Sequence, residues 1–231
     1  VLLDSDIDSY LRKIAMRNCQ IQIHAIGDRG NQMVLNAYEK AYKDFPKKDL
    51  RWRIEHAQNV IEADRKRFKD LNIIASMQPS HAIGDLHFAE DRLGFERLSN
   101  AYTWKSFIDD GVVVVGGSDA PVEVGDPIIE FYAAVTRKDL DGYSNEGWNL
   151  QQALSREEAL AIFTKWPAYA IFKEDKLGTL EIGKLADITI FDQDIMTIPN
   201  EDILATKVVM TVVGGKICLL YTSDAADDLL C

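Results

Sequence analysis

The sequence has 231 residues, 47% of them hydrophobic and 27% charged, which is the composition of an ordinary globular protein with a sizeable core. Its formal net charge of -11 argues against a nucleic-acid partner and against docking on anionic membranes, and no apolar run approaches the roughly 20 residues that span a bilayer. The cysteines, Cys19, Cys218 and Cys231, show no paired spacing, so we expect a cytoplasmic location, with secretion left open because the chain begins without methionine.

Helices and strands alternate through the first half of the chain. Apolar spacing and turn residues predict a helix over 6–18, a strand over 20–24, a helix over 28–46, a strand over 50–56, a helix over 60–71, a strand over 73–77 and a helix over 102–109. Asp28 is the expected cap of the second helix, and residues 78–101 form an irregular polar segment. This alternation predicts a parallel sheet with right-handed crossovers.

The last strand of this series lies in the stretch VVVVGGSDAP, residues 112–121. Four β-branched residues in a row predict a strand that is buried on both faces, as in a parallel sheet covered by helices. Asp119 follows at the carboxyl end of this strand. In α/β folds, ligand-binding and catalytic residues lie at the carboxyl ends of the strands, so Asp119 is a candidate functional residue.

Two histidines close strands in the same way. His24 ends the strand QIQIH and His56 ends the strand LRWRIEH. If these strands and the one before Asp119 are parallel members of one sheet, the three side chains converge on one rim, and two imidazoles with a carboxylate suit a zinc-like ion. The competing interpretations are a strand-end histidine bonded to a neighbouring carbonyl, and a turn role for Asp119 before Pro121.

The pattern changes after Pro121. A short helix is predicted over 127–135, and Ser155 with Glu158 forms a capping box for a helix over 156–172, kinked at Trp166-Pro167. Two β-like segments follow, 186–191 and 207–213. They resemble part of a small β domain that is too short to close a sheet alone.

The domain organisation follows from these elements. A full eight-stranded barrel needs about 250 residues, and only about four strand-helix units fit here, so the simplest account is the C-terminal half of a larger enzyme. We predict a partial barrel over 1–175, part of a β-sandwich over 176–218, and a tail over 219–231. The end of that tail, YTSDAADDLLC, fits no pattern of the domain and resembles translated adapter sequence.

An ordered set of motifs carries a family resemblance. These motifs are IHAIGD, RIEHAQ, SMQPSHA, GSDAPVE and LGTLEIGKLADITIFDQD, which lie between residues 23 and 194. Together they resemble the metal-dependent amidohydrolase superfamily, and within it amidohydrolase family 3, the YtcJ-like branch that includes N-substituted formamide deformylase. The resemblance implies a distorted (β/α)8 barrel, of which this chain holds about strands five to eight, with a β-sandwich assembled from both chain ends.

The resemblance also implies roles for single residues. His24 matches the metal ligand after strand five, His56 the ligand after strand six, and Asp119 the strand-eight aspartate that binds metal and moves protons. The family's strand-one His-x-His pair and its strand-four bridging position have no counterpart in this chain. His81 and Gln78 are candidate substrate contacts, with a solvent-facing role equally compatible with the sequence. Asp28 and Glu55 could orient the imidazoles, although capping is the simpler role for Asp28.

The first functional hypothesis is a zinc-dependent hydrolase of small-molecule amides, with one or two ions, in which Asp119 shuttles the proton between water and the departing nitrogen. A second hypothesis is an inactive fragment or interaction protein that keeps the barrel fold. A third, weaker one is another metal-dependent barrel hydrolase, of the deaminase or phosphotriesterase type. Half a barrel exposes strand edges, so we also expect association into a homo-oligomer.

Overall fold

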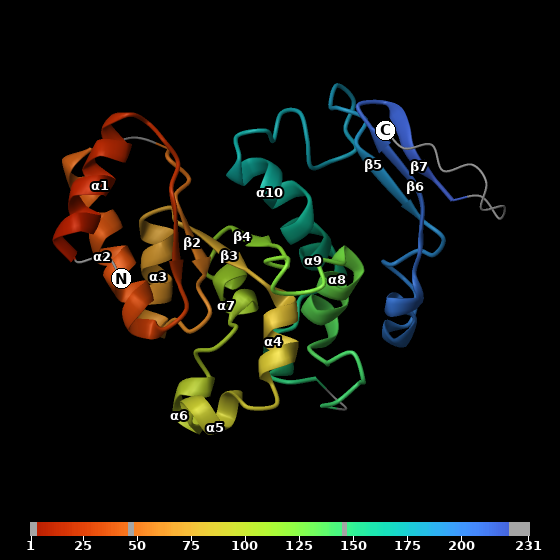
Figure 1. Cartoon of the computed structure of the whole chain (residues 1–231), viewed down its shortest axis with the longest axis horizontal. Coiled ribbons are helices and arrows are strands. Elements are labelled where there is room, and N and C mark those ends of the chain that lie inside the picture. The colour runs from red at the N-terminus through yellow and green to blue at the C-terminus, as the bar shows by residue number, and fades with distance from the viewer. Residues whose placement is uncertain (1–3, 46–48, 145–146, 222–231) are drawn as a thin grey trace.

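The computed structural model describes residues 4–45, 49–144 and 147–221, which form a parallel sheet, an antiparallel sheet and the helices around them (Figure 1). The helices and strands, with two 3-10 helices (η), are in chain order α1 (Asp4–Met16), β1 (Gln22–Ala25), α2 (Asp28–Asp44), β2 (Arg53–His56), α3 (Glu62–Asp70), β3 (Ile74–Met77), α4 (Pro79–Asp85), α5 (Ala89–Leu93), α6 (Phe95–Leu98), α7 (Trp104–Asp109), β4 (Val114–Gly116), α8 (Pro127–Thr136), η1 (Leu150–Gln152), α9 (Arg156–Phe163), α10 (Lys165–Ala170), β5 (Ile188–Phe191), η2 (Asn200–Ala205), β6 (Val208–Val213) and β7 (Lys216–Leu220).

The first sheet is parallel and has the strand order β1-β2-β3-β4. Its register places Ala25 opposite His56, and Met77 opposite Gly116, so the strands end at a common edge. The helices α1, α2 and α3 lie on one side of the sheet, and α8, α9 and α10 lie on the other (Figure 1). The predicted α/β fold with a parallel sheet is therefore confirmed.

The core fills the space between this sheet and its helices. The predicted apolar stripe of α2 is buried, with Leu35 and Tyr38 both at 0% exposure, and it meets Trp52 ahead of β2. Tyr38 donates its hydroxyl to the Arg53 carbonyl at 2.8 Å, and the Trp52 indole N–H reaches the Cys19 carbonyl at 3.0 Å. Each such large side chain contributes about 1.5–3 kcal/mol by leaving water.

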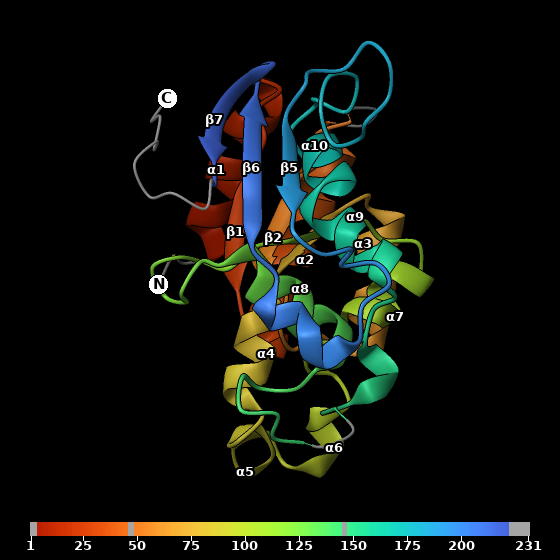
Figure 2. The same cartoon turned by 90° about the vertical axis from the view of Figure 1, so that its right-hand side faces the viewer.

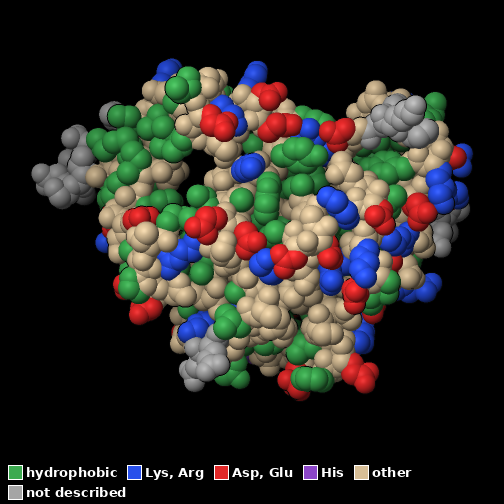
Figure 3. Space-filling view, turned by 180° about the vertical axis from the view of Figure 1, so that it is seen from behind, with side chains coloured by type: hydrophobic (Ala, Val, Ile, Leu, Met, Phe, Trp, Pro, Cys, Tyr) green, Lys and Arg blue, Asp and Glu red, His purple; other side chains and the backbone are tan. Residues whose placement is uncertain are grey.

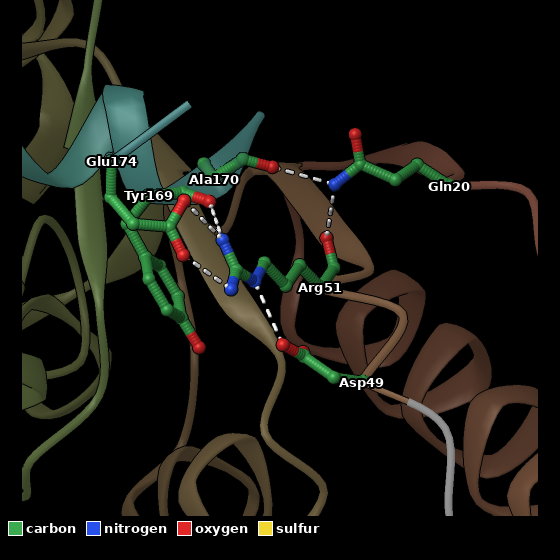
Figure 4. A network of polar contacts seen from close by, with 6 residues as sticks. All are labelled: Gln20, Asp49, Arg51, Tyr169, Ala170 and Glu174. Carbon is green, nitrogen blue, oxygen red and sulfur yellow. Dashed lines mark hydrogen bonds and ion pairs between the residues drawn. The ribbon is translucent and has the colours of Figure 1, made fainter. Parts of the chain in front are cut away.

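The amino ends of β1 and β2 are fixed to α10 by a buried arginine (Figure 4). Arg51 is 7% exposed and donates two bonds to the Glu174 carboxylate, at 2.6 and 2.9 Å. Its guanidinium lies 3.8 Å from the centre of the Tyr169 ring and 4.0 Å from that of Phe172. Gln20 adds a bond of 2.6 Å to the Ala170 carbonyl. This end of the sheet is thus held by packing and charge, and the opposite edge carries the candidate site.

Several local predictions differ from the structure. The helix expected over 156–172 is two helices, α9 and α10, with Thr164 non-helical between them at φ -129° and ψ -79°. The break follows because the Pro167 ring clashes with the carbonyl four residues earlier, that of Phe163. The segment 78–101 holds the short helices α4, α5 and α6 instead of being irregular. Asp28 is not a cap: Gly27 occupies that position, and Asp28 accepts a bond from Arg97 at 3.0 Å.

The second sheet is antiparallel, in the order β5-β6-β7, and faces the viewer in Figure 2. The sequence indicated β5 and β6 but not β7, which follows β6 after the turn Gly214-Gly215. Both glycines have positive φ, 56° and 80°, as a two-residue hairpin turn requires. β7 runs to Leu220, two residues past the predicted domain boundary at 218. The prediction of a non-native tail concerns mainly residues 222–231, which lie outside the described residues.

Hydrophobic side chains gather on the surface over this second sheet, on the left in Figure 3, whereas charges of both signs are interspersed over the helices on the right. Val213 and Ile217 are 53% and 51% exposed there. Among the helices of the described residues, none has both the length and the apolar character to cross a membrane.

Candidate metal centre

His24 and His56 lie side by side at the carboxyl edge of the parallel sheet. Their ring centres are 4.6 Å apart and their planes are inclined by 76°. His56 is buried at 6% exposure, while His24 is exposed. The pair forms because β1 and β2 are parallel neighbours in which His24 stands opposite Glu55, so both histidines reach the same edge. The sheet register thus brings these two side chains together, as the sequence predicts.

A chain of hydrogen bonds fixes the orientation of His56. Its Nδ1 lies 2.8 Å from Gln78 Oε1, and Gln78 Nε2 donates to Glu55 Oε1 at 2.8 Å. Ser76 Oγ donates to the same carboxylate oxygen at 2.8 Å. Because Glu55 only accepts hydrogen bonds when ionised, the Gln78 amide must turn its NH2 toward Glu55 and its oxygen toward His56.

The consequence for His56 is a defined tautomer. An amide oxygen can only accept, so Nδ1 of His56 carries the proton and donates it to Gln78. Nε2 then keeps its lone pair and is the nitrogen available to a metal ion. Histidines that bind metals commonly hold their second ring nitrogen in this way. Glu55 therefore acts on His56 through Gln78, and it does not touch the imidazole.

The backbone at the site is strained. His56 has φ 75°, Ala57 has φ 41° and Asp119 has φ 57°, all in the left-handed region that residues other than glycine seldom adopt. Such residues cost about 1–3 kcal/mol each and cluster at functional sites. Two of the three predicted metal ligands are therefore held in conformations that the surrounding fold must enforce.

Asp119 lies on the loop that follows β4, three positions after Gly116. It is exposed, and its carbonyl accepts the Val122 N–H at 2.8 Å. Within the described ranges its carboxylate has no hydrogen-bond or ion-pair partner, and no group of three His, Cys, Asp or Glu residues is arranged to hold a metal ion. The structure brings His24 and His56 together and does not complete the trio with Asp119.

His81 adds a third imidazole next to the pair. Its ring centre is 5.7 Å from that of His56, with the planes inclined by 22°. Its Nε2 is buried, lies 3.7 Å from Glu123 Oε1 and has no hydrogen-bond partner. Gln78, the other predicted substrate contact, is 5% exposed and engages both ends of its amide with His56 and Glu55.

Two further acids near the site were not singled out from the sequence. Glu123 ends the motif GSDAPVE and faces His81. Glu130 on α8 is 3% exposed and accepts the Ser80 N–H at 3.0 Å. Burial raises the pKa of Glu130 above its ordinary value. The sequence feature that could have identified Glu130 is its position as the single acid in the apolar helix PIIEFYAAVT.

The donor set can be tested against a zinc-like ion. Neutral imidazole nitrogen is a standard zinc ligand, and Gln78 leaves Nε2 of His56 free for that role. His24 is exposed beside it. The described residues thus offer two neighbouring imidazoles, which are half of the four-coordinate set that zinc adopts in proteins, and they hold no third ligand beside the pair.

Solved structures with this fold include metal-dependent hydrolases. A metal-dependent hydrolase from Pyrococcus horikoshii OT3, described as uncharacterized, superposes with a TM-score of 0.73 at 29% identity, over 87% of this chain and 39% of that chain. This chain belongs to the amidohydrolase family, whose model matches residues 2–219. The resemblance to amidohydrolase family 3 that the motifs indicated is confirmed.

Two relatives extend this finding. The protein named "Putative amidohydrolase YtcJ" from Bacillus subtilis (strain 168) is 32% identical over 214 residues, which are 93% of this chain and 40% of that protein. N-substituted formamide deformylase from Arthrobacter pascens is 27% identical over 216 residues, 91% of this chain and 38% of that protein. The chain therefore spans well under half the length of these relatives.

Proposed function

We propose that this chain is the part of a metal-dependent amidohydrolase that carries strands five to eight of a (β/α)8 barrel, and that the complete enzyme hydrolyses carbon–nitrogen bonds of small-molecule amides. The observation that carries the proposal is the histidine pair at the carboxyl edge, with His56 Nε2 left free by Gln78. The sequential strand order β1-β2-β3-β4 is that of a barrel segment, and a deformylase among the relatives supports the amide bond as the target.

The residues that would hold the metal are His24, His56 and Asp119, and we take zinc, as one or two ions, to be the metal. A bound zinc ion would supply hydroxide at neutral pH by lowering the pKa of its bound water to about 7. His56 contributes through its Nε2, in the tautomer that Gln78 sets. His24 is accessible from solvent, so it is the side of the pair from which an ion enters.

Asp119 is the proton carrier in this proposal. Its exposed carboxylate has no competing partner in the part of the chain that the structure describes, so it is free to accept a proton from water and deliver it to the departing nitrogen. His81 and Gln78 are the proposed substrate contacts. The buried Nε2 of His81 offers a hydrogen bond to a substrate oxygen, and the second amide hydrogen of Gln78 is a further donor.

A zinc titration of the 231-residue chain tests the metal site. His24→Ala and His56→Ala should each abolish saturable zinc binding measured by calorimetry, because two imidazoles hold the ion. His87→Ala is the matched control, since His87 is exposed and pairs with Asp139 at 2.8 Å. Zinc affinity that is equal in His56→Ala and in the unchanged chain would refute the assignment of the pair.

The activity is tested on the complete gene product. N-substituted formamides and other small amides should be hydrolysed, and Asp119→Asn should lower kcat by about 100-fold or more while zinc stays bound, because the proton carrier is lost. Full turnover by that variant would contradict the role of Asp119. Turnover of phosphotriesters or of amino-heterocycles in place of amides would favour the other barrel hydrolases.

A second candidate function is a non-catalytic fragment or interaction protein. It is favoured by the absence, among the described residues, of a three-ligand metal group. Strands β1 and β4 each have one neighbour within the described sheet, and with the apolar surface over β5-β6-β7 they offer contacts for self-association. This function predicts an oligomer by light scattering, with neither zinc binding nor hydrolysis. Among the described residues, Cys19 and Cys218 form no disulfide, which supports the cytoplasm as the proposed location.

A further inference from the structure

A cavity of about 260 Å³ lies between α4, α8 and the loops that follow β4 and α8. It begins next to the candidate metal centre, because Ser80 in its wall precedes His81 and Glu123 in its wall faces the His81 ring. Apolar side chains line one part of it, among them Ile83 and Ile129. It is large enough for a small organic group of a few carbon atoms.

Acids dominate the lining of this cavity. Among the described residues the lining includes Glu123, Glu130, Asp139 and Asp141, and its one basic side chain is His87. Asp139 is already engaged by His87 at 2.8 Å and by the Tyr143 N–H at 2.7 Å. An anionic ligand would meet like charge here, because the one basic side chain is already paired with Asp139, so the lining discriminates against it.

Two of these acids, Glu123 and Asp141, can still accept hydrogen bonds from a ligand. Among the described residues, Glu123 faces His81 Nε2 at 3.7 Å, which is beyond hydrogen-bond distance. Asp141 is exposed, and in the described chain its carboxylate has no partner. Glu130 accepts one bond from the Ser80 N–H, and its burial raises its pKa, which a neighbouring cation would reverse.

The wall also holds a buried hydroxyl that makes no hydrogen bond of proper geometry within the described residues. Ser80 is 4% exposed, and its Oγ lies beside the Glu130 carboxylate, where it opposes the rise of that pKa without forming an aligned hydrogen bond. Buried polar groups are nearly always satisfied, so an unsatisfied one in a cavity wall indicates a group that binds there. A hydroxyl oxygen can accept from an ammonium group as the carboxylates do.

We propose that this acidic cavity binds a positively charged amine group of the substrate, so that the enzyme acts on amides that carry an ammonium group near the scissile bond. The inference rests on the proposed function, because the cavity opens beside the candidate metal centre. The ammonium group lies against Glu123 and Asp141, with Ser80 Oγ as a further acceptor, and the carbon chain packs on Ile83 and Ile129.

Binding is tested on the 231-residue chain with n-butylammonium as the probe, in the presence of a metal chelator, by ¹H–¹⁵N NMR titration. Saturable shifts are expected at the amides of Gly84 and Gly125, which line the cavity. Butyrate, of the same length and opposite charge, should cause no saturable shifts. Equal binding of butyrate and n-butylammonium would overturn the proposal.

Variants locate the probe. Glu123→Gln and Asp141→Asn should each weaken n-butylammonium binding by roughly tenfold, because each removes a charged acceptor. Glu157→Gln is the matched control, an exposed acid on α9 outside the cavity lining, and should leave the affinity unchanged. Asp141 is itself exposed, so its variant tests the cavity without disturbing the core. Undiminished affinity in both cavity variants would sink the proposal.

The outcome is separable from that of the proposed function, because the titration uses no metal and no turnover. Binding of n-butylammonium with the variant pattern above, in a protein whose complete form hydrolyses no amide, would keep the cavity site and refute the activity. Hydrolysis of amides without any preference for ammonium over carboxylate substrates in kcat/KM would keep the activity and refute the cavity site.

Discussion

Replacing Gln78 by leucine should change both the tautomer of His56 and the affinity for zinc. Leucine has a similar size and no hydrogen-bonding group, so the variant removes the acceptor 2.8 Å from His56 Nδ1 and the donor 2.8 Å from Glu55 Oε1. His56 is only 6% exposed, so a proton left on Nδ1 would be buried without a partner. That costs about 1–3 kcal/mol, and the imidazole can avoid the cost by moving its proton to Nε2.

The magnitude for zinc follows from the same bond. A proton on Nε2 must be displaced before this nitrogen can bind the ion, and loss of an outer hydrogen-bond partner of a metal ligand typically costs 10–100-fold in affinity. This range corresponds to about 1.4–2.8 kcal/mol, which agrees with the cost of one unsatisfied buried group. We therefore expect zinc to bind the variant about 10–100-fold more weakly.

Two measurements check this expectation. Long-range ¹H–¹⁵N NMR of the metal-free chain reports which nitrogen of His56 carries the proton, and calorimetry gives the zinc affinity. Gln152→Leu is the matched control, because Gln152 also makes two side-chain bonds, both to Ser106. It should lower stability without moving the His56 proton. If Gln78→Leu keeps the Nδ1–H tautomer and the zinc affinity, the hydrogen bonds from Glu55 through Gln78 to His56 do not set the tautomer or the affinity of the site.

Three further predictions concern stability. Burial raises the pKa of Glu130 above the value near 4.5 that it has in the unfolded state, so the native state binds the proton more tightly and the free energy of unfolding should fall as the pH rises from 4.5 to the native pKa. Glu130→Gln should flatten that fall in urea titrations across pH. Parallel pH profiles for the variant and the unchanged chain would contradict this prediction. Gly116→Ala places a Cβ 2.9 Å from Cδ1 of the Phe163 ring and should cost about 1–3 kcal/mol in urea unfolding, whereas Gly117→Ala meets nothing within 4 Å and should cost far less. Arg51→Met should lower the free energy of unfolding by about 2–4 kcal/mol, and a loss below 0.5 kcal/mol would show that its stacking and ion pairs contribute little.

The sequence was sufficient to predict the features that repeat along the chain. Alternating apolar residues that stop at a histidine placed His24 and His56 at strand ends, and the parallel register then brings their rings together. The buried stripe of α2 and the capping box of Ser155 were predicted for the same reason, since each depends on fixed local spacing. β7 was missed because its exposed, mixed residues alternate only weakly after Gly215.

The features that depend on side-chain contacts between elements could not be predicted in the same way. The bond from Gln78 to His56 joins residues 22 positions apart and exists only once β2 and β3 are paired in register. Asp119 was expected to meet the histidines because it follows a parallel strand, yet its loop leaves it exposed without a partner among the described residues. Strand order fixes which edge a residue reaches, and the loop after the strand decides where the side chain points.

The contacts that Arg51 makes with Tyr169 and Glu174 have a consequence for the order in which the polypeptide folds. Arg51 and Glu174 are 123 positions apart, so the ion pair between them can form only after a very long loop has closed. A nascent chain that ends before Tyr169 has β1 and β2 without the helix that secures their first residues. The Gln20 side-chain amide and the Arg51 guanidinium, which both donate to carbonyls of α10, should therefore become ordered only together with α10, and they report on the last stage of folding.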